Sequence, residues 1–82
     1  MTPKPLFEEG FSFYFFSNEN NEPAHVHVAK GEGNAKWWLE PEVKENYSYG
    51  FKPNQRRRIR KLIEEHRGKL LEAWYEHFKK ER

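Results

Sequence analysis

The architecture follows from the segment His25-Val-His-Val-Ala-Lys-Gly-Glu-Gly-Asn-Ala-Lys-Trp-Trp-Leu39, in which two strand-like runs flank a glycine-containing turn. The first run, residues 25–30, alternates with a period of two, which is typical of a half-buried strand. Residues 31–34 predict a hairpin connection, and residues 35–39 resume the strand pattern. The segment therefore predicts two antiparallel neighbours in a sheet.

Further strands are expected on both sides of this hairpin. Phe11-Ser-Phe-Tyr-Phe-Phe16 is rich in aromatic residues that favour strands, and it ends at the turn formers of Ser17-Asn-Glu-Asn-Asn-Glu-Pro23. Beyond Pro41, residues 42–49 suggest a short fourth strand that ends at the Gly50 turn. We therefore expect an antiparallel β-meander of three or four strands over about residues 11–49.

From Pro53 onward the apolar residues recur at three- and four-residue steps, which marks one face of a helix. Pro53 suits the first helical position. Gly68 costs up to about 1 kcal/mol against Ala in a helix interior, so we expect one helix near 53–66 and another near 68–80. A single kinked helix is the alternative. Since an apolar helical stripe must cover a sheet face, the sequence predicts a single α+β domain over residues 1–82.

Alternation of side chains across each strand divides the expected sheet into two faces. The face covered by helices is expected to carry Phe11, Phe13, Phe15, Val26, Val28, Ala35, Trp37 and Leu39. The opposite face is expected to carry Ser12, Tyr14, Phe16, His25, His27, Ala29, Lys36 and Trp38.

Composition limits the classes of function. Of 82 residues, 17% are aromatic, and these rings must supply the core because a short chain buries a smaller fraction of its surface. The net charge of +2 does not by itself argue for a nucleic-acid partner. The chain has no Cys, which fits a reducing compartment, and no apolar run approaches the roughly 20 residues that a bilayer requires. We therefore expect a cytoplasmic protein without a membrane segment.

The first candidate site is the pair His25 and His27, which are expected to project from the same face of one strand. Imidazoles titrate near neutrality, so the pair can serve as general base and general acid, including in RNA cleavage. A metal site needs a third ligand, and the sequence does not choose among Glu19, Glu22 and His77. We therefore predict neither a metal nor another cofactor. The structural alternative is that both histidines are half-exposed and pack beside Tyr14 and Trp38.

The second candidate site is a cluster of cations at the start of a helix, formed by Arg56, Arg57, Arg58, Arg60 and Lys61. Cations at this terminus oppose the helix dipole, so helix stability alone does not explain their presence. Binding of phosphate at the helix N-terminus does explain it. Pairing of Arg60 with Glu64 and of Lys61 with Glu65 on a solvated face is the alternative. On the open sheet face, Lys36 is predicted to hold phosphate and Tyr14 and Trp38 to stack bases. The alternative there is a second small core or a partner interface.

The chain closely resembles a family of small bacterial proteins known as a domain of unknown function. The resemblance covers nearly the whole chain and lies in Tyr14-Phe-Phe-Ser-Asn18, Pro23-Ala-His-Val-His-Val28, Lys36-Trp-Trp-Leu39, Gly50-Phe51 and Leu70-Leu-Glu-Ala-Trp74. The region around Asn20-Asn21 and the cluster Arg56–Lys61 are local variations. The resemblance implies a gene encoded beside another small protein, as in toxin-antitoxin pairs, but it assigns no reaction.

Together these observations predict a component of a toxin-antitoxin-like pair, toxin-like, that acts on RNA and has a small cognate protein partner. The competing hypothesis is a non-enzymatic module that binds a neighbouring small protein through its sheet.

Overall fold

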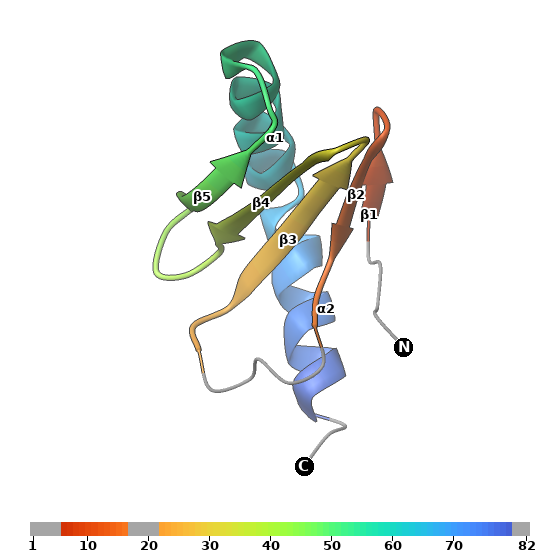
Figure 1. Cartoon of the computed structure of the whole chain (residues 1–82). Helices are drawn as coiled ribbons and strands as arrows, with labels where there is room; N and C mark the ends of the chain where they lie inside the picture. Colours follow the sequence, from red (N-terminus) through yellow and green to blue (C-terminus); the bar gives the residue numbers. More distant parts are fainter. Residues whose placement is uncertain (1–5, 17–21, 80–82) are drawn as a thin grey trace.

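The computed structural model describes residues 6–16 and 22–79 and shows an antiparallel sheet backed by two helices (Figure 1). The strands are β1 (Leu6–Glu8), β2 (Phe11–Tyr14), β3 (His25–Lys30), β4 (Gly33–Trp38) and β5 (Lys44–Tyr49), in the spatial order β1-β2-β3-β4-β5. The helices are α1 (Pro53–Glu65) and α2 (Arg67–Lys79). The α+β class and the meander followed by two helices are confirmed. The prediction of three or four strands is wrong, because the described residues form five.

The additional strand is β1, which extends the sheet to Leu6, ahead of the expected start at residue 11. It pairs with β2 through a two-residue turn at Glu9 and Gly10, both of which have positive φ, 54° and 83°. Such a turn suits the twist of a tight hairpin. Three residues are too few to show a period of two, which is why sequence periodicity missed this strand.

The break between the helices falls at His66, two residues before the expected bend at Gly68. His66 has φ −110° and ψ 15°, and its N–H donates to the Leu62 carbonyl at 3.0 Å, which closes α1. Gly68 lies in the first turn of α2. Two separate helices therefore form, rather than one kinked helix.

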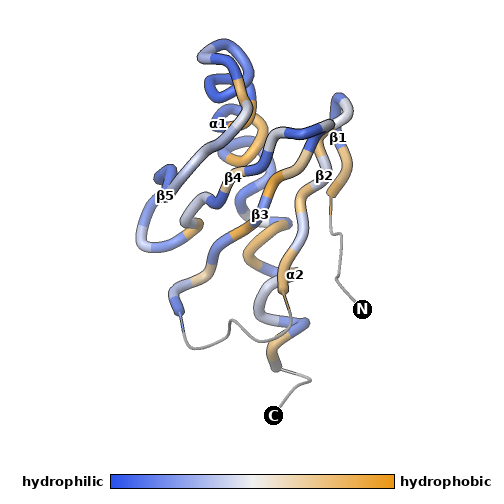
Figure 2. Tube along the Cα trace, in the orientation of Figure 1, coloured by the Kyte–Doolittle hydropathy of each residue, from blue (hydrophilic) through white to orange (hydrophobic). Residues whose placement is uncertain are grey.

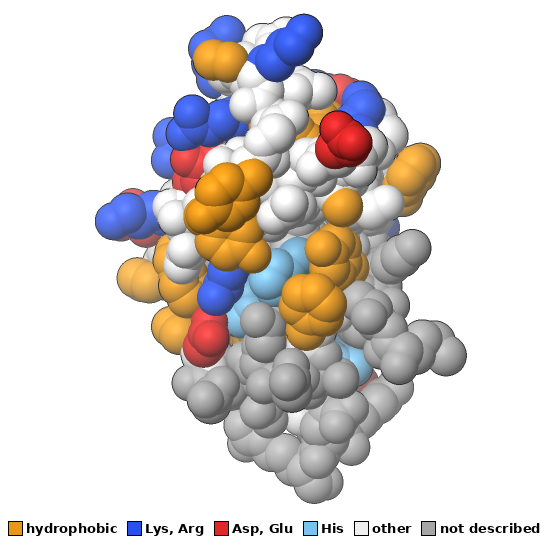
Figure 3. Space-filling view, in the orientation of Figure 1, with side chains coloured by type: hydrophobic (Ala, Val, Ile, Leu, Met, Phe, Trp, Pro, Cys, Tyr) orange, Lys and Arg blue, Asp and Glu red, His pale blue; other side chains and the backbone are white. Residues whose placement is uncertain are grey.

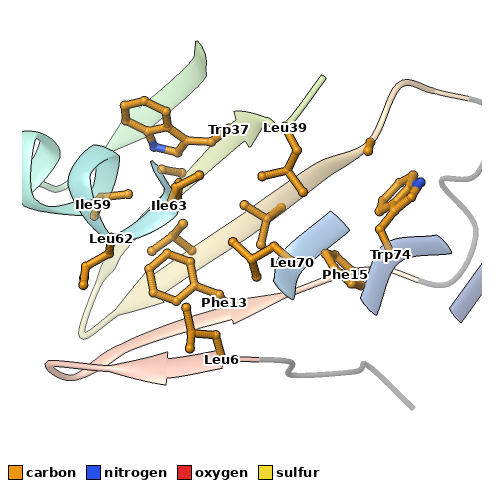
Figure 4. Close-up of a cluster of buried hydrophobic side chains, with 14 of the residues drawn as sticks. Leu6, Phe13, Phe15, Trp37, Leu39, Ile59, Leu62, Ile63, Leu70 and Trp74 are labelled. Atoms are coloured by element: carbon orange, nitrogen blue, oxygen red, sulfur yellow. The ribbon is translucent and has the colours of Figure 1, made fainter. Parts of the chain in front are cut away.

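The core lies between the sheet and the helices (Figure 4). All eight residues predicted for the covered face are buried. They meet an apolar stripe from the two helices, consisting of Ile59, Leu62, Ile63, Leu70, Trp74 and Phe78. Figure 2 shows hydrophobic positions recurring along β2, β3 and the helices. The two-residue period of the strands and the three- to four-residue period of the helices thus place their apolar side chains in one shared core.

Polar contacts fix α1 and α2 against this face of the sheet. Arg56 forms two hydrogen bonds with the Glu45 carboxylate of β5, at 2.9 and 2.5 Å. Arg58 forms a similar pair of bonds with Glu9 in the β1–β2 turn. Arg67 donates from Nε to the Leu39 carbonyl at 2.9 Å. Both helices therefore lie on one side of the sheet, and within residues 6–16 and 22–79 no helix covers the opposite face (Figure 1).

Within the described residues, neither helix is long and apolar enough to cross a membrane.

Candidate functional site

The face of the sheet opposite the helices, here called the open face, carries aromatic side chains from four strands and from Phe16, two positions beyond the end of β2. The strand register places Tyr14 beside His27, His27 beside Lys36, and Lys36 beside Tyr47. The strand pairing assigns the strand residues to this face, and the ring contact with Tyr14 assigns Phe16. The aromatic and cationic side chains of the open face are Phe7, Tyr14, Phe16, Lys36, Trp38, Lys44, Tyr47 and Tyr49. Phe7, Tyr49 and Phe16 are 68%, 65% and 41% exposed. Hydrophobic surface is therefore presented across the width of the sheet (Figure 3).

The two histidines of β3 lie beneath this aromatic surface. His25 and His27 are only 0% and 4% exposed, so they are buried rather than half-exposed. The His27 ring stacks on Tyr14, with centroids 5.5 Å apart, and meets Phe16 edge-on at 4.6 Å. Figure 3 shows histidine side chains recessed between hydrophobic groups. The pair therefore supports the open face from below.

His25 is also held by groups outside the open face. Its ring centroid lies 4.8 Å from that of Trp74 in α2, 5.5 Å from that of Trp38, and 5.3 Å from that of His27. The Nδ1–H donates to the Pro23 carbonyl at 2.9 Å. A hydrogen bond to this carbonyl fixes the tautomer and the ring orientation. His25 therefore joins the sheet to α2.

Lys36 belongs to the same cluster of side chains. Its Nζ donates to the Glu22 carboxylate at 2.7 Å and lies 4.6 Å from the centre of the Trp38 ring. The Glu22 carboxylate is also 3.9 Å from Nδ1 of His25. The side chain of Lys36 is 12% exposed. Its charge is therefore largely engaged within the domain.

Within residues 6–16 and 22–79, no group of three or more His, Cys, Asp or Glu side chains is placed to hold a metal ion. Glu22 and His77 therefore do not complete a set of ligands with the histidine pair. Glu19 lies outside the described residues.

Of the five cations in the basic cluster of α1, two form ion pairs with carboxylates and three form none among the described residues. Arg56 and Arg58 are held by Glu45 and Glu9, and the hydrogen bond from Arg58 is the main reason that the pKa of Glu9 lies below its usual value of 4.5. The remaining three cations, Arg57, Arg60 and Lys61, are exposed. Since α1 packs on the other side of the sheet, the structure gathers His25, His27, Tyr14, Lys36 and Trp38 but does not bring the basic cluster to them.

Four members of the open face were not assigned to a site by the sequence. Tyr47, Tyr49 and Lys44 come from β5, and Phe7 comes from β1. Tyr47 and Tyr49 are two residues apart, a spacing that places both on one face of a strand. That spacing was available in the sequence, whereas the position of Phe7 depends on recognising β1.

The fold and the aromatic face thus define a small α+β domain with an open antiparallel sheet. Residues 10–75 match the family described as a domain of unknown function, DUF4160, and the chain belongs to that family. No curated protein and no solved structure matches the chain.

Proposed function

We propose that this domain is a non-enzymatic binding module that docks a small partner protein on its open face. The observation that supports this most strongly is the set of rings at Phe7, Phe16 and Tyr49, which are 41–68% exposed on a sheet face that neither described helix covers. Exposed apolar side chains gathered on one face of a domain commonly mark interaction sites.

The chemistry of the open face resembles the centre of a protein interface. Such centres are enriched in Tyr, Trp and Phe and are depleted of charged residues. Here Tyr14 and Phe16 pack edge to face at 5.4 Å, and Tyr47 and Tyr49 pack at 5.4 Å. Because each of these rings packs against a neighbouring ring, little side-chain entropy remains to be lost on binding. The face is therefore preorganised for a complementary apolar surface.

Charge on the open face favours a partner with an acidic rim over a second copy of this chain. Among the described strand residues the face carries Lys36 and Lys44, and no strand contributes a carboxylate to it. Glu22 engages Lys36, but Lys44 forms no ion pair in the part of the chain that the structure describes. Face-to-face self-association would bring like charges together, which is unfavourable.

The toxin-like action on RNA stays a prediction. General acid–base cleavage requires an imidazole within hydrogen-bond reach of the substrate, and the burial of His25 and His27 supports a structural role instead. The assembly with a cognate small protein, implied by the family resemblance, is retained in the present proposal, with the open face as its contact surface.

The proposal is tested by co-expressing the domain with the small protein encoded beside it and measuring the affinity of the purified pair by calorimetry. Replacing Phe7 or Tyr49 by Ser is expected to cost at least about 1 kcal/mol, or roughly fivefold in Kd, as for an aromatic ring that the partner covers. Tyr75→Ser is the matched control, because Tyr75 is 53% exposed but lies on α2.

Two results would contradict the proposal. One is a complex whose affinity responds to Tyr75→Ser as strongly as to Phe7→Ser and Tyr49→Ser. The other is sedimentation of the domain alone as a dimer that the open-face variants dissociate, because the occupant of the face would then be a second copy.

A further inference from the structure

A second surface, on the other side of the sheet, is formed where α1 begins. A cavity of about 300 Å³ lies between the first two turns of α1 and the strands β4 and β5, lined by Trp37, Glu45, Pro53, Arg56, Arg57 and Arg60. Three of these six residues are arginines, and one is a glutamate. The cavity is therefore distinct from the open face and carries an excess of positive charge.

Two of the three arginines have no compensating carboxylate. Glu45 is taken up by its two hydrogen bonds with Arg56. Arg57 and Arg60 form no ion pair within residues 6–16 and 22–79, and the pair that the sequence allows between Arg60 and Glu64 does not form. Arg60 instead lies over the Trp37 ring, 5.6 Å from its centre.

A buried donor in the cavity wall also lacks an acceptor. The Nε1–H of Trp37 is buried and forms no hydrogen bond within the described part of the chain. Figure 4 shows this indole beside Ile59 and Ile63 of α1. A buried unpaired N–H is costly and uncommon. The cavity thus presents two guanidinium groups that form no ion pair among the described residues, and both are suited to an acceptor-rich group.

The helix itself is arranged unfavourably without such a group. The first turn of α1 contains no acidic residue, although the N-terminus of a helix attracts negative charge. Arg56 ends that turn and Arg57 begins the next one, and their positive charges oppose the dipole. An anion bound in the cavity would be attracted by both the arginines and the helix terminus.

We propose that this cavity binds phosphate groups of a nucleic-acid backbone without reading bases. Guanidinium forks match phosphate oxygens in pairs. Arg57, Arg60 and Lys61 lie at i, i+3 and i+4, so they form one exposed row that continues beyond the cavity and fits successive phosphates better than a single anion. Trp37 is 3% exposed and covered by Arg60, which leaves no ring in the cavity for a base to stack on.

The test uses fluorescence anisotropy with a labelled 20-nucleotide oligouridylate at 50 and 200 mM salt. Arg57→Gln/Arg60→Gln is expected to lower the affinity at least tenfold and to reduce the slope of log K against log salt by about 1.4, at roughly 0.7 per phosphate contact for single strands. Lys69→Glu lowers the net charge by the same two units at an exposed position of α2 and is expected to change the affinity less than threefold.

Equal losses in the arginine double variant and in Lys69→Glu would overturn the proposal, because binding would then follow net charge alone. A larger loss in Lys69→Glu would move the nucleic-acid site away from α1 and overturn it as well. Absence of oligonucleotide binding at 50 mM salt would overturn the proposal, and direct binding of inorganic phosphate or uridine monophosphate at micromolar concentration in its place would identify a small-ligand pocket. Circular dichroism is the check that both variants are folded.

Discussion

Replacing His25 by Ala is expected to destabilise the domain strongly. The change removes a ring that is fully buried against Trp38 and Trp74, and it removes the hydrogen bond to the Pro23 carbonyl. Truncation of a buried aromatic ring to Ala costs about 3 to 5 kcal/mol. The imidazole is smaller, so we expect about 2 to 4 kcal/mol in all, of which about 1 kcal/mol belongs to the hydrogen bond.

Two further variants separate these contributions. His25→Asn keeps an N–H donor near the position of Nδ1, so it is expected to be about 1 kcal/mol more stable than His25→Ala. Tyr49→Ala, on the open face and 65% exposed in the wild type, is expected to change the free energy of unfolding by less than about 0.5 kcal/mol.

Thermal unfolding followed by tryptophan fluorescence measures these differences. For a domain of this size, 1 kcal/mol corresponds to about 4 to 8 °C, so a loss of about 2 to 4 kcal/mol in His25→Ala should lower the Tm by about 8 to 32 °C. A Tm within about 3 °C of the wild type would refute the structural role of His25. If His25→Ala does not fold, the Tm of His25→Asn carries the test.

This result decides how a growth or RNA-cleavage assay of His25→Ala/His27→Ala can be interpreted. Arrest of growth by the wild type alone supports the predicted toxin-like activity only if the double variant remains folded. Without a stability measurement, loss of activity would equally reflect loss of the packing around Trp38 and Trp74.

Three other predictions concern the scaffold. Gly68→Ala, in the first turn of α2 with nothing within 4 Å of the added methyl group, should stabilise the domain by about 0.4 to 1 kcal/mol and raise its Tm. Gly33→Ala should destabilise it by about 1 to 3 kcal/mol in urea unfolding, because the methyl group would lie 2.6 Å from the Phe51 ring. The pKa of Glu9 is lowered chiefly by its hydrogen bond from Arg58, so this contribution to stability is present at neutral pH and is lost as the pH falls through the lowered pKa. The stability advantage of the wild type over Arg58→Gln should therefore shrink below pH 4.5, and an advantage independent of pH would contradict it.

Local periodicity in the sequence determined most of the fold. Alternation in β3 and β4 identified Val26, Val28 and Trp37 as core residues, and the three- to four-residue steps after Pro53 identified the helices. These predictions succeeded because the direction of a side chain in a strand or helix depends on its position within that element alone. The placement of Tyr14 beside His27 followed from the same alternation once the strands were in register.

Only the tertiary structure decided what the candidate residues can do. His25 is buried partly by Trp74, which lies on a helix far along the chain, so its exposure could not be obtained from the alternation of β3. Arg57 and Arg60 lie on α1, and the packing of α1 against one face separates them from the aromatic rings of the other by the thickness of the sheet. Burial and distance depend on contacts between elements, and a periodic pattern within one element carries no information about either.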